Sequence, residues 1–331
     1  MSGHVLAVLR AGEVERLDVT GVANADTGDP LTGDSLFYVG SLAKQFVAAC
    51  ARLLADDGAL DLDAPVSTYV DGLPDWGEAV RVRHLIHHTS GIADRNYADF
   101  PGVPIEGVPA RDSDNAIEEI RRLDALVSPP GTRYRYANRG YHLLGYMVAR
   151  AAGVSVASFA HERLFSPLGM IESFFRDAPT DLPRHAARGH FEAVDGGTYV
   201  EPARFHAVGA GGLWTSVADL ARWDAAFYDP TTVAPRLTER GALDDGTPIH
   251  YAWGLSVRTH RGQPIHSHGG SFPGWNAKMV RFPEQRTTVL VLANRETLDV
   301  SALALDTADA VLAEALDPDA PHADDTFDGV T

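Results

Sequence analysis

Strand patterns lie at both ends of this chain, and helix patterns fill the middle. Residues 4–10 and 14–23 have the composition of two strands joined by the turn AGE, a β-hairpin. Beyond residue 250 strand patterns return, separated by turn residues: HYAWGLSVRTH, PIHSH, WNAKMVRF and TTVLVLAN. Strands at both termini imply one sheet built from both ends, and short connections favour antiparallel pairing. We therefore predict an α/β protein of the α+β type, with an antiparallel β-sheet flanked by helices and an inserted all-helical lobe.

The length of 331 residues allows two lobes within one domain. We predict a single domain over residues 1–316, with an α/β lobe from about 1–60 and 250–316 and a helical lobe from about 61–249. The last 15 residues, DPDAPHADDTFDGVT, hold five acids and no Lys or Arg. Residues 317–331 are therefore expected to form a flexible acidic tail.

The strongest helix pattern covers residues 41–57. Ser41 suits the N-terminus of this helix, and Gly58 suits the position just after its end. Few polar residues occur in the first three turns, so this helix is expected to be buried. Further helices are predicted, in chain order, behind the capping pair Asn115 and Glu118, over 141–153, over 216–227 behind Ser216, and over 301–316.

The formal net charge of −17 argues against nucleic acid or an anionic membrane as a partner, because both require basic patches. No window approaches the roughly 18 apolar residues of a membrane span, and no signal peptide is visible. A cytoplasmic location is therefore expected, although a leader removed beforehand would leave the same sequence. Cys50, the only cysteine, lies in the apolar run FVAACARLLA, where a buried hydrophobe is expected rather than a nucleophile. Oligomeric state is not indicated.

Lysine is rare in this chain: 26 of the 28 basic residues are arginines, and Lys44 is one of only two lysines. Lys44 stands three residues after Ser41, so the two share one face of a helix. A desolvated lysine can lose its proton and then take the proton of a serine hydroxyl, which arginine cannot do. S-x-x-K alone is weak evidence, because it also occurs as an ordinary pair on a helix surface.

Tyr136 and Asn138 form a second candidate element, in the turn-rich stretch PPGTRYRYANRGYHLLG. Two residues apart on an extended segment, a phenol and an amide project in the same direction. The phenol could relay a proton, and the amide could hold a substrate carbonyl. The alternative is structural, with a packed tyrosine ring and an asparagine that caps the next helix.

The stretch HSHGGSFPGW contains a third candidate element, His268 followed by Gly269 and Gly270. The glycines allow a ligand backbone to approach closely, and an edge strand here could pair with a peptide-like substrate. His268 could donate a hydrogen bond into the cleft or pass a proton. Zinc binding by His266 and His268 is disfavoured, because no third ligand follows at motif spacing. No metal or organic cofactor is expected.

A group of histidines, His84, His87 and His88, lies in VRHLIHHTSGI. No Cys, Asp or Glu motif accompanies them, so packing or loop hydrogen bonds are favoured over a metal site. The chain has no G-x-S-x-G elbow, Walker loop or dinucleotide fingerprint, so those enzyme classes lack support.

In chain order, S-x-x-K, Y-x-N and H-x-G together resemble the motifs of the serine β-lactamase and penicillin-binding-protein superfamily, specifically its class C-like branch. Further stretches from about residue 35 to 295 resemble landmarks of that family in the same order: FYVGSLAKQF, VRHLIHHTSGI, PPGTRYRYANRGYHLLG, LFSPLGM, GAGGLWTSVADLARW and HGGSFPGW. The branch includes D-alanyl-D-alanine carboxypeptidases, D-amino-acid peptidases and amidases, and carboxylesterases. The resemblance implies a β-lactamase/transpeptidase-like fold.

The resemblance also implies roles for residues at matching positions. Ser41 would be the acylated nucleophile. Lys44 and Tyr136 would share the general-base and proton-relay work, and Asn138 would position the substrate. The backbone N–H groups of Ser41 and Ser271 would form an oxyanion hole.

The triplet His268-Gly269-Gly270 would contact substrate, and His268 would stand where many relatives have the lysine of K-T-G. A histidine is mostly neutral at pH 7, and the middle residue here has no hydroxyl. Such a triplet holds a carboxylate less well than Lys-Thr-Gly. Efficient β-lactam hydrolysis is therefore less expected than peptidase, amidase or esterase activity.

These observations predict a serine hydrolase that cleaves a small ester, amide or short peptide through an acyl-enzyme on Ser41. The expected type is an esterase or a D-amino-acid peptidase or amidase. The alternative is a β-lactamase or penicillin-binding DD-carboxypeptidase. A non-catalytic ligand sensor is less favoured, because a binding module needs no deprotonatable lysine beside a serine. The shape of the pocket is expected to depend on loops such as 95–115.

Overall fold

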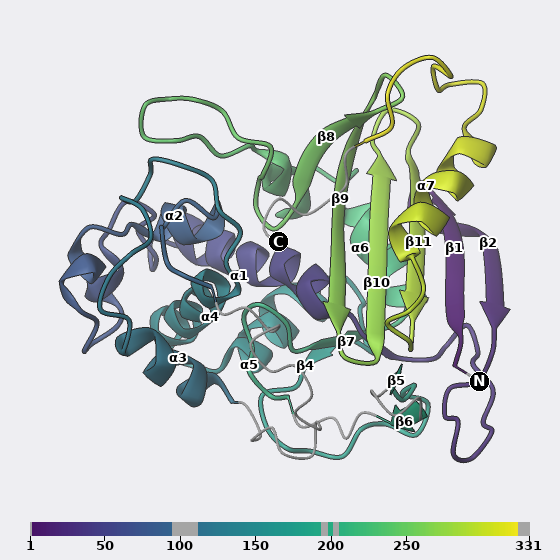
Figure 1. The fold of residues 1–331 in the computed structure, drawn as a ribbon, viewed down its shortest axis with the longest axis horizontal. Coiled ribbons are helices and arrows are strands. Elements are labelled where there is room, and N and C mark those ends of the chain that lie inside the picture. Colours follow the sequence, from purple (N-terminus) through teal and green to yellow (C-terminus); the bar gives the residue numbers. More distant parts are fainter. Residues whose placement is uncertain (1, 95–111, 193–197, 201–204, 324–331) are drawn as a thin grey trace.

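A six-stranded antiparallel sheet dominates the computed structural model, which describes residues 2–94, 112–192, 198–200 and 205–323. The strand order is β2-β1-β11-β10-β9-β8 (Figure 1). The strands are β1 (His4–Arg10), β2 (Glu13–Thr20), β8 (Ser256–His260), β9 (Gln263–Phe272), β10 (Trp275–Phe282) and β11 (Thr287–Ala293). Strands β1 and β11 join the N-terminal hairpin to the C-terminal strands. The prediction of an antiparallel sheet built from both chain ends is confirmed.

Strand β11 shows that both faces of the sheet are covered, because all seven of its residues are buried. Val289 and Val291 belong to one apolar core, whereas Leu290 and Leu292 belong to another. Successive side chains of a strand point to opposite faces, so one continuous apolar run serves two cores. The run TTVLVLA thus fits a central strand.

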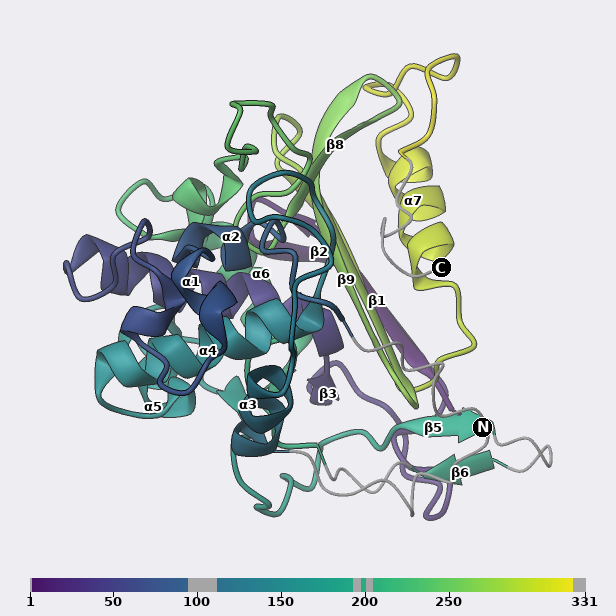
Figure 2. The ribbon, with the colours of Figure 1, turned by 60° about the vertical axis from the view of Figure 1, so that its left-hand side comes forward.

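Helix α7 (Val300–Val311) covers one face of the sheet, and the other helices lie on the opposite face (Figure 2). Helix α6 (Val217–Ala226) packs there against β1 and β2. It does so although it falls within the range 61–249 that was expected to form the helical lobe. The division of the chain into lobes at about residues 60 and 250 stays a prediction.

Helix α1 (Lys44–Asp56) lies at the centre of the helices on that opposite face, with nine buried residues. A 3₁₀ turn, Gly40–Ala43, leads into it. It contacts α4 and α5, which confirms the prediction of a buried helix here. The other helices are α2 (Val82–Ile86), α3 (Ser113–Arg121), α4 (Asn138–Ala152), α5 (Val156–Ala160) and a π-helix (His161–Phe165), with 3₁₀ turns at Val66–Thr68, Asp75–Glu78 and Ala234–Thr238.

Short strands complete the fold below the main sheet. They are β3 (Phe37–Tyr38), β7 (Leu213–Thr215) and β4 (Phe174–Phe175) in one sheet, and β5 (His190–Glu192) with β6 (Thr198–Val200) in another. Strand β3 immediately precedes the turn that carries Ser41, so the small sheet helps to fix the start of α1.

Two predicted helix ends are confirmed, whereas one predicted cap is wrong and α7 ends at Val311 instead of at residue 316. The side chain of Ser216 caps α6 by accepting from Asp219 N, as predicted. Helix α4 ends at Gly153, which has a left-handed φ of 71°. Helix α3 is capped by Asp112, which accepts from Asn115 N at 2.8 Å, so Asn115 is not the cap. Asp112 has the extended backbone conformation that an N-cap residue adopts, whereas Asn115 already lies within the helix. Asp112 is therefore the residue whose side chain can cap α3.

The C-terminal segment turns back onto the β8–β9 hairpin. Pro321 O accepts from Arg261 N at 2.9 Å, and Ala323 N donates to His260 Nδ1 at 3.1 Å. These contacts hold residues 317–323, the described part of the expected flexible tail, whereas residues 324–331 lie outside the described residues.

Among the described helices, none alone is long and apolar enough to cross a membrane. One pair, 138–152 with 156–165, reaches that length and composition only across a 74° bend.

Candidate active site

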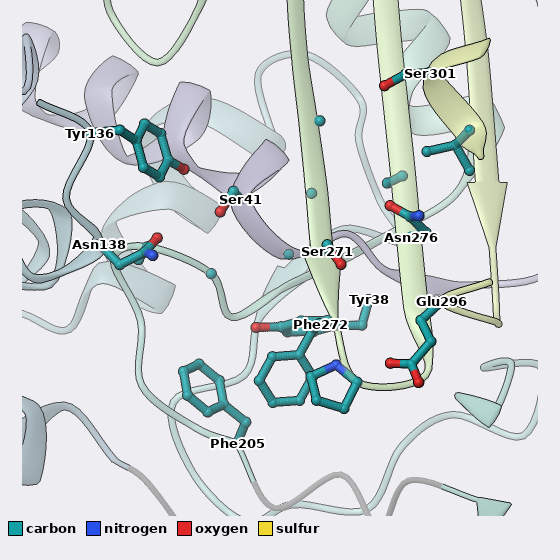
Figure 3. Close-up of a pocket in the computed structure, with 18 of the residues that line it drawn as sticks. Tyr38, Ser41, Tyr136, Asn138, Phe205, Ser271, Phe272, Asn276, Glu296 and Ser301 are labelled. Atoms are coloured by element: carbon teal, nitrogen blue, oxygen red, sulfur yellow. The ribbon is translucent and has the colours of Figure 1, made fainter. Parts of the chain in front are cut away.

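A pocket of about 470 Å³ lies where β9 passes the starts of α1 and α4 (Figure 3). Five of the seven candidate site residues line it: Ser41, Tyr136, Asn138, Gly270 and Ser271. The remaining lining residues are Tyr38, Gly40, His142, Phe205, Ala210, Gly211, Gly269, Phe272, Pro273, Asn276, Ala277, Glu296, Asp299, Val300 and Ser301. In Figure 3 the side chains of Tyr136 and Asn138 lie on the same side of β9 as Ser41.

Lys44 is fully buried and hydrogen-bonded to Ser41, with 2.8 Å between Nζ and Oγ. The 3₁₀ turn Gly40–Ala43 and the first turn of α1 place the two residues on one face, as the i, i+3 spacing predicts. Nζ also lies 2.8 Å from Asn138 Oδ1 and 3.0 Å from Ala210 O. All three partners are uncharged oxygens.

Burial lowers the pKa of the Lys44 amine from 10.5 to about 7, and the nearby Asp94 carboxylate opposes this shift. A neutral amine has two N–H donors and one lone pair. The two carbonyl oxygens, Asn138 Oδ1 and Ala210 O, can only accept, so they take both donors. The lone pair then faces Ser41 Oγ, which is the arrangement that a base needs to take the hydroxyl proton.

Tyr136 also contacts the Ser41 hydroxyl. Burial raises the pKa of its phenol well above the ordinary value of 10, and a hydrogen bond with Ser41 opposes this shift. The phenol is therefore protonated at neutral pH and is available as a hydrogen-bond donor. Its ring also lies 4.8 Å from Lys44 Nζ.

Asn138 bridges Lys44 and a carboxylate that the sequence analysis did not identify. Its Oδ1 accepts from Lys44, while its backbone N and its Nδ2 donate to Asp94 Oδ2 at 2.8 and 3.0 Å. Ala137 is extended (φ −147°, ψ 117°), so Tyr136 and Asn138 project into the same pocket. Asn138 is also the first residue of α4, but Asp94 caps this helix end instead of the asparagine side chain.

Two glycines bring the backbones of residues 40–41 and 270–271 together. A Cβ on Gly270 would lie 2.0 Å from Val39 O and 2.8 Å from Ser41 N. A Cβ on Gly40 would lie 3.0 Å from Ser271 N, and Gly40 has a left-handed φ of 51°. Only residues without a side chain permit this approach. It places Ser41 N and Ser271 N on the two sides of one narrow gap, where an oxyanion could lie.

The end of β9 is an edge of the main sheet beside this gap. The pairing of β8 with β9 stops at Ser267, so no described strand pairs with the β8 side of residues 268–272. An exposed strand edge can add an extended peptide through main-chain hydrogen bonds. The site therefore combines a candidate nucleophile with a place for a peptide-like ligand.

The chain matches the beta-lactamase family over residues 1–314. It belongs to this family. The predicted membership of the serine β-lactamase and penicillin-binding-protein superfamily is thereby confirmed.

Curated relatives include a D-aminopeptidase of Gluconobacter oxydans, 30% identical over an alignment of 299 residues that covers 88% of this chain and 55% of the relative. Penicillin-binding protein 4* of Bacillus subtilis is 29% identical over an alignment of 315 residues that covers 89% of this chain and 68% of the relative. The chain thus spans about half the length of the D-aminopeptidases that it matches.

Solved structures support the same fold. The octameric penicillin-binding protein homologue from Pyrococcus abyssi has a TM-score of 0.82 and 27% identity, covering 94% of this chain and 73% of its own. The D-amino acid amidase of Ochrobactrum anthropi SV3 has a TM-score of 0.77 and 24% identity, covering 94% and 93%. The predicted β-lactamase/transpeptidase-like fold is confirmed.

His268, which occupies the slot of the family lysine, does not line the pocket. The ring is buried: Nδ1 lies 2.6 Å from Gly269 O, and Nε2 lies 3.0 Å from Tyr251 Oη. A carbonyl can only accept, so Nδ1 carries the proton and Nε2 accepts from Tyr251. Burial is the main reason that the pKa of His268 lies well below 6.5, and the charge of Lys44 is the second. The geometry gives no support to the expected hydrogen bond from His268 into the cleft.

The structure adds residues that sequence reasoning missed or left as packing. His88 has a left-handed φ of 56°, and its Nδ1 accepts from Ala137 N at 3.1 Å. Its ring lies 4.3 Å from the ring of Tyr136. His88 therefore fixes the segment that carries the phenol, which agrees with the expectation of packing and loop hydrogen bonds. The stretch HHTSGIAD, which holds both His88 and Asp94, was the available signal.

One group in the described chain has the composition of a metal site, away from the pocket: His260, Asp309 and His322. His260 Nδ1 accepts from Ala323 N, so its Nε2 carries the proton and donates to Asp309 at 2.7 Å. The guanidinium of Arg261 donates to Asp309 and to His322. These contacts use the ligand atoms without an ion.

Cys50 lies in the core, where burial raises the pKa of its thiol to about 12, so the thiol is not nucleophilic.

Proposed function

We propose that this protein is a serine hydrolase that cleaves a small amide, ester or short peptide through an acyl-enzyme on Ser41. One observation carries the proposal: a buried amine with a pKa of about 7, Lys44, lies 2.8 Å from the Ser41 hydroxyl. The family match and the D-aminopeptidase and penicillin-binding relatives support a serine hydrolase of this superfamily.

In the acylation step, neutral Lys44 takes the proton of Ser41 as Oγ attacks the substrate carbonyl carbon. The carbonyl oxygen becomes negative and accepts from the N–H groups of Ser41 and Ser271. Such preorganised donors contribute about 2.7–4 kcal/mol each where one has been removed from a protease. The bond to the leaving group then breaks, and Tyr136 relays the proton from Lys44 to the leaving atom.

In the deacylation step, a water attacks the ester carbonyl of acylated Ser41. Lys44 takes a proton from that water through Tyr136 or directly, and the proton returns to Ser41 Oγ as the ester bond breaks. Asn138 holds the amine in place during both steps, because its amide is fixed between Lys44 and Asp94. Asp94 is a positioning residue in this scheme.

The aromatic side chains of the pocket and the strand edge beside it support a proposal for the substrate class. Tyr38, Phe205 and Phe272 form an aromatic wall, with ring centroids 5.1–6.4 Å apart. Together with the unpaired edge of β9, this wall suits an amide or ester of an amino acid with an apolar side chain. The relatives named D-aminopeptidase lead us to propose the D-configuration.

The alternative, a β-lactamase or DD-carboxypeptidase, is supported by the penicillin-binding relatives. Its substrates carry a carboxylate, and His268 is a buried neutral ring at the position where many family members have a cation. Turnover of nitrocefin comparable to turnover of an ester would replace the leading proposal with this one.

An intact-mass time course after mixing with p-nitrophenyl butyrate tests the proposal. Wild type should show a transient adduct of one butyryl group together with steady release of nitrophenol. Ser41→Ala should show neither, while Ser166→Ala, a matched control at an exposed serine outside the pocket, should behave as wild type. Equal nitrophenol release by Ser41→Ala and wild type would exclude Ser41 as the nucleophile.

A further inference from the structure

The charged lining of the pocket has a single sign. Glu296 and Asp299 line it, and no described lysine or arginine does. Glu296 follows β11 and Asp299 precedes α7, so both belong to the end of the pocket near the first turn of α7. In Figure 3, Glu296 and Asn276 lie across β9 from Tyr136 and Asn138.

We propose that Glu296 and Asp299 bind a cationic group of the substrate, so that the enzyme prefers ammonium-bearing esters or amides to uncharged or carboxylate-bearing ones. This inference rests on the serine hydrolase function proposed above, and it assigns a specificity to the same pocket. The two carboxylates are specificity-determining residues, and the bond-breaking steps do not involve them.

The hydrogen-bond partners of the two carboxylates carry no charge. Asp299 Oδ1 accepts from Ala302 N at 2.9 Å, and Glu296 Oε2 lies 3.4 Å from Gly274 N. These partners are neutral amides, and the ion pairs of the described chain do not include either acid. Both side chains are exposed, so a ligand can reach them.

Among the described residues, none at the opposite end of the pocket carries a fixed positive charge. Lys44 is tied to three neutral oxygens and titrates near neutrality, and His268 is held as a neutral ring by Gly269 and Tyr251. A substrate carboxylate would therefore meet two negative charges and no described lining cation. An ammonium group would meet attraction at one end and no repulsion from a fixed cation at the other.

The expected preference is moderate because the acids are exposed. An exposed ion pair typically changes an affinity by up to about fivefold. Two carboxylates should therefore favour a cationic over an uncharged substrate by up to about 25-fold in kcat/KM. The preference should shrink with added salt, because exposed charges are screened.

Isosteric substrates separate charge from shape. On the acyl side, the p-nitrophenyl ester of 4-(trimethylammonio)butanoate is compared with that of 5,5-dimethylhexanoate, in which carbon replaces the nitrogen. On the leaving-group side, butyrylcholine is compared with 3,3-dimethylbutyl butyrate. The pair that shows the preference identifies which side of the scissile bond lies toward Glu296.

The variants are Glu296→Gln, Asp299→Asn and the double variant. Asparagine caps a helix about as well as aspartate, so Asp299→Asn removes the charge and keeps the cap of α7. Glu284→Gln, in the β10–β11 turn, removes one charge outside the pocket and serves as the matched control. Thermal melting checks that each variant is folded.

The double variant should reduce the cationic-to-neutral ratio of kcat/KM to about one. Glu284→Gln should retain the wild-type ratio. An unchanged ratio in the folded double variant, or a wild-type ratio near one in both pairs, overturns the inference while hydrolysis of the neutral ester still supports the serine hydrolase. If no ester is hydrolysed by wild type, the proposed function itself fails.

Discussion

Lys44 and Arg281 are two basic side chains that the fold buries, with 0% and 1% of their surfaces exposed. Arg281 on β10 donates from Nε to Asp224 on α6 at 2.6 Å, and Thr288 on β11 donates to the same carboxylate oxygen at 2.7 Å. Lys44 has hydrogen bonds only to the hydroxyl, amide and backbone oxygens described above. One buried group faces a carboxylate, and the other faces neutral dipoles.

The difference in partners decides what each group does. A buried carboxylate lies opposite the guanidinium, so the Asp224–Arg281 pair ties α6 to the main sheet. Neutral oxygens do not balance an ammonium, so burial removes much of the stability of the charged form of Lys44. The same desolvation thus gives a structural link in one region and a proposed base in the other.

Charge-conserving exchanges at the two positions give the sharpest contrast. Lys44→Arg should lower kcat by about 10⁴-fold, the upper range for loss of an acid–base group, because a guanidinium cannot take the Ser41 proton. Arg281→Lys retains a cation opposite Asp224 and should keep kcat within about threefold. Steady-state hydrolysis of p-nitrophenyl butyrate measures both. An active Lys44→Arg variant would remove Lys44 from the mechanism and end the comparison.

Removal of one partner from the structural pair should act on stability instead of turnover. Asp224→Ala leaves a buried guanidinium without its carboxylate and should lower the free energy of unfolding by about 3–5 kcal/mol. The double variant Asp224→Ala/Arg281→Met removes both charges and should recover much of that loss. Urea unfolding measures the stability of each variant, and kcat per folded molecule should remain near wild type. A single variant as stable as wild type would show that the pair does not tie α6 to the sheet.

Local periodicity made part of the site predictable. Ser41 and Lys44 lie within one helical turn, so their spacing alone sets their contact. Tyr136 and Asn138 lie two residues apart around an extended alanine, so their common direction also follows from the local backbone. The strand patterns predicted the β1–β2 hairpin and the run from β8 to β11 for a similar reason, because strands that follow one another in the chain pair across short turns.

Contacts between distant segments were not predictable in this way. Asp94 holds Asn138 across 44 residues, and His88 holds Ala137 across 49. The direction of His268 depends on the register of β9 and on Tyr251, which lies on the irregular segment before β8. A strand pattern does not specify which neighbour a buried imidazole meets. Residues 95–111, most of the loop expected to shape the pocket, lie outside the described residues.

The pH dependence of turnover gives the smallest and most specific effect. In the proposed mechanism the base is the neutral amine of Lys44, which predominates above its pKa of about 7. Therefore kcat/KM should be flat above pH 7 and fall about tenfold for each pH unit below it. Arg281→Lys should leave this acid limb in place, because Arg281 takes no part in the proton transfer.

Asp94 offers a test of the sign of this effect. Its carboxylate opposes the lowering of the pKa of Lys44. Asp94→Asn removes that charge and retains an amide oxygen that can accept from Asn138, so the pKa of Lys44 should fall further. The acid limb of kcat/KM should therefore move to lower pH, even if the plateau also drops because Asn138 is held less firmly. An acid limb that moves to higher pH, or does not move, would mean that the limb reports the pKa of a group other than Lys44. Lys44 would then not be the base, and its contrast with Arg281 would no longer concern catalysis.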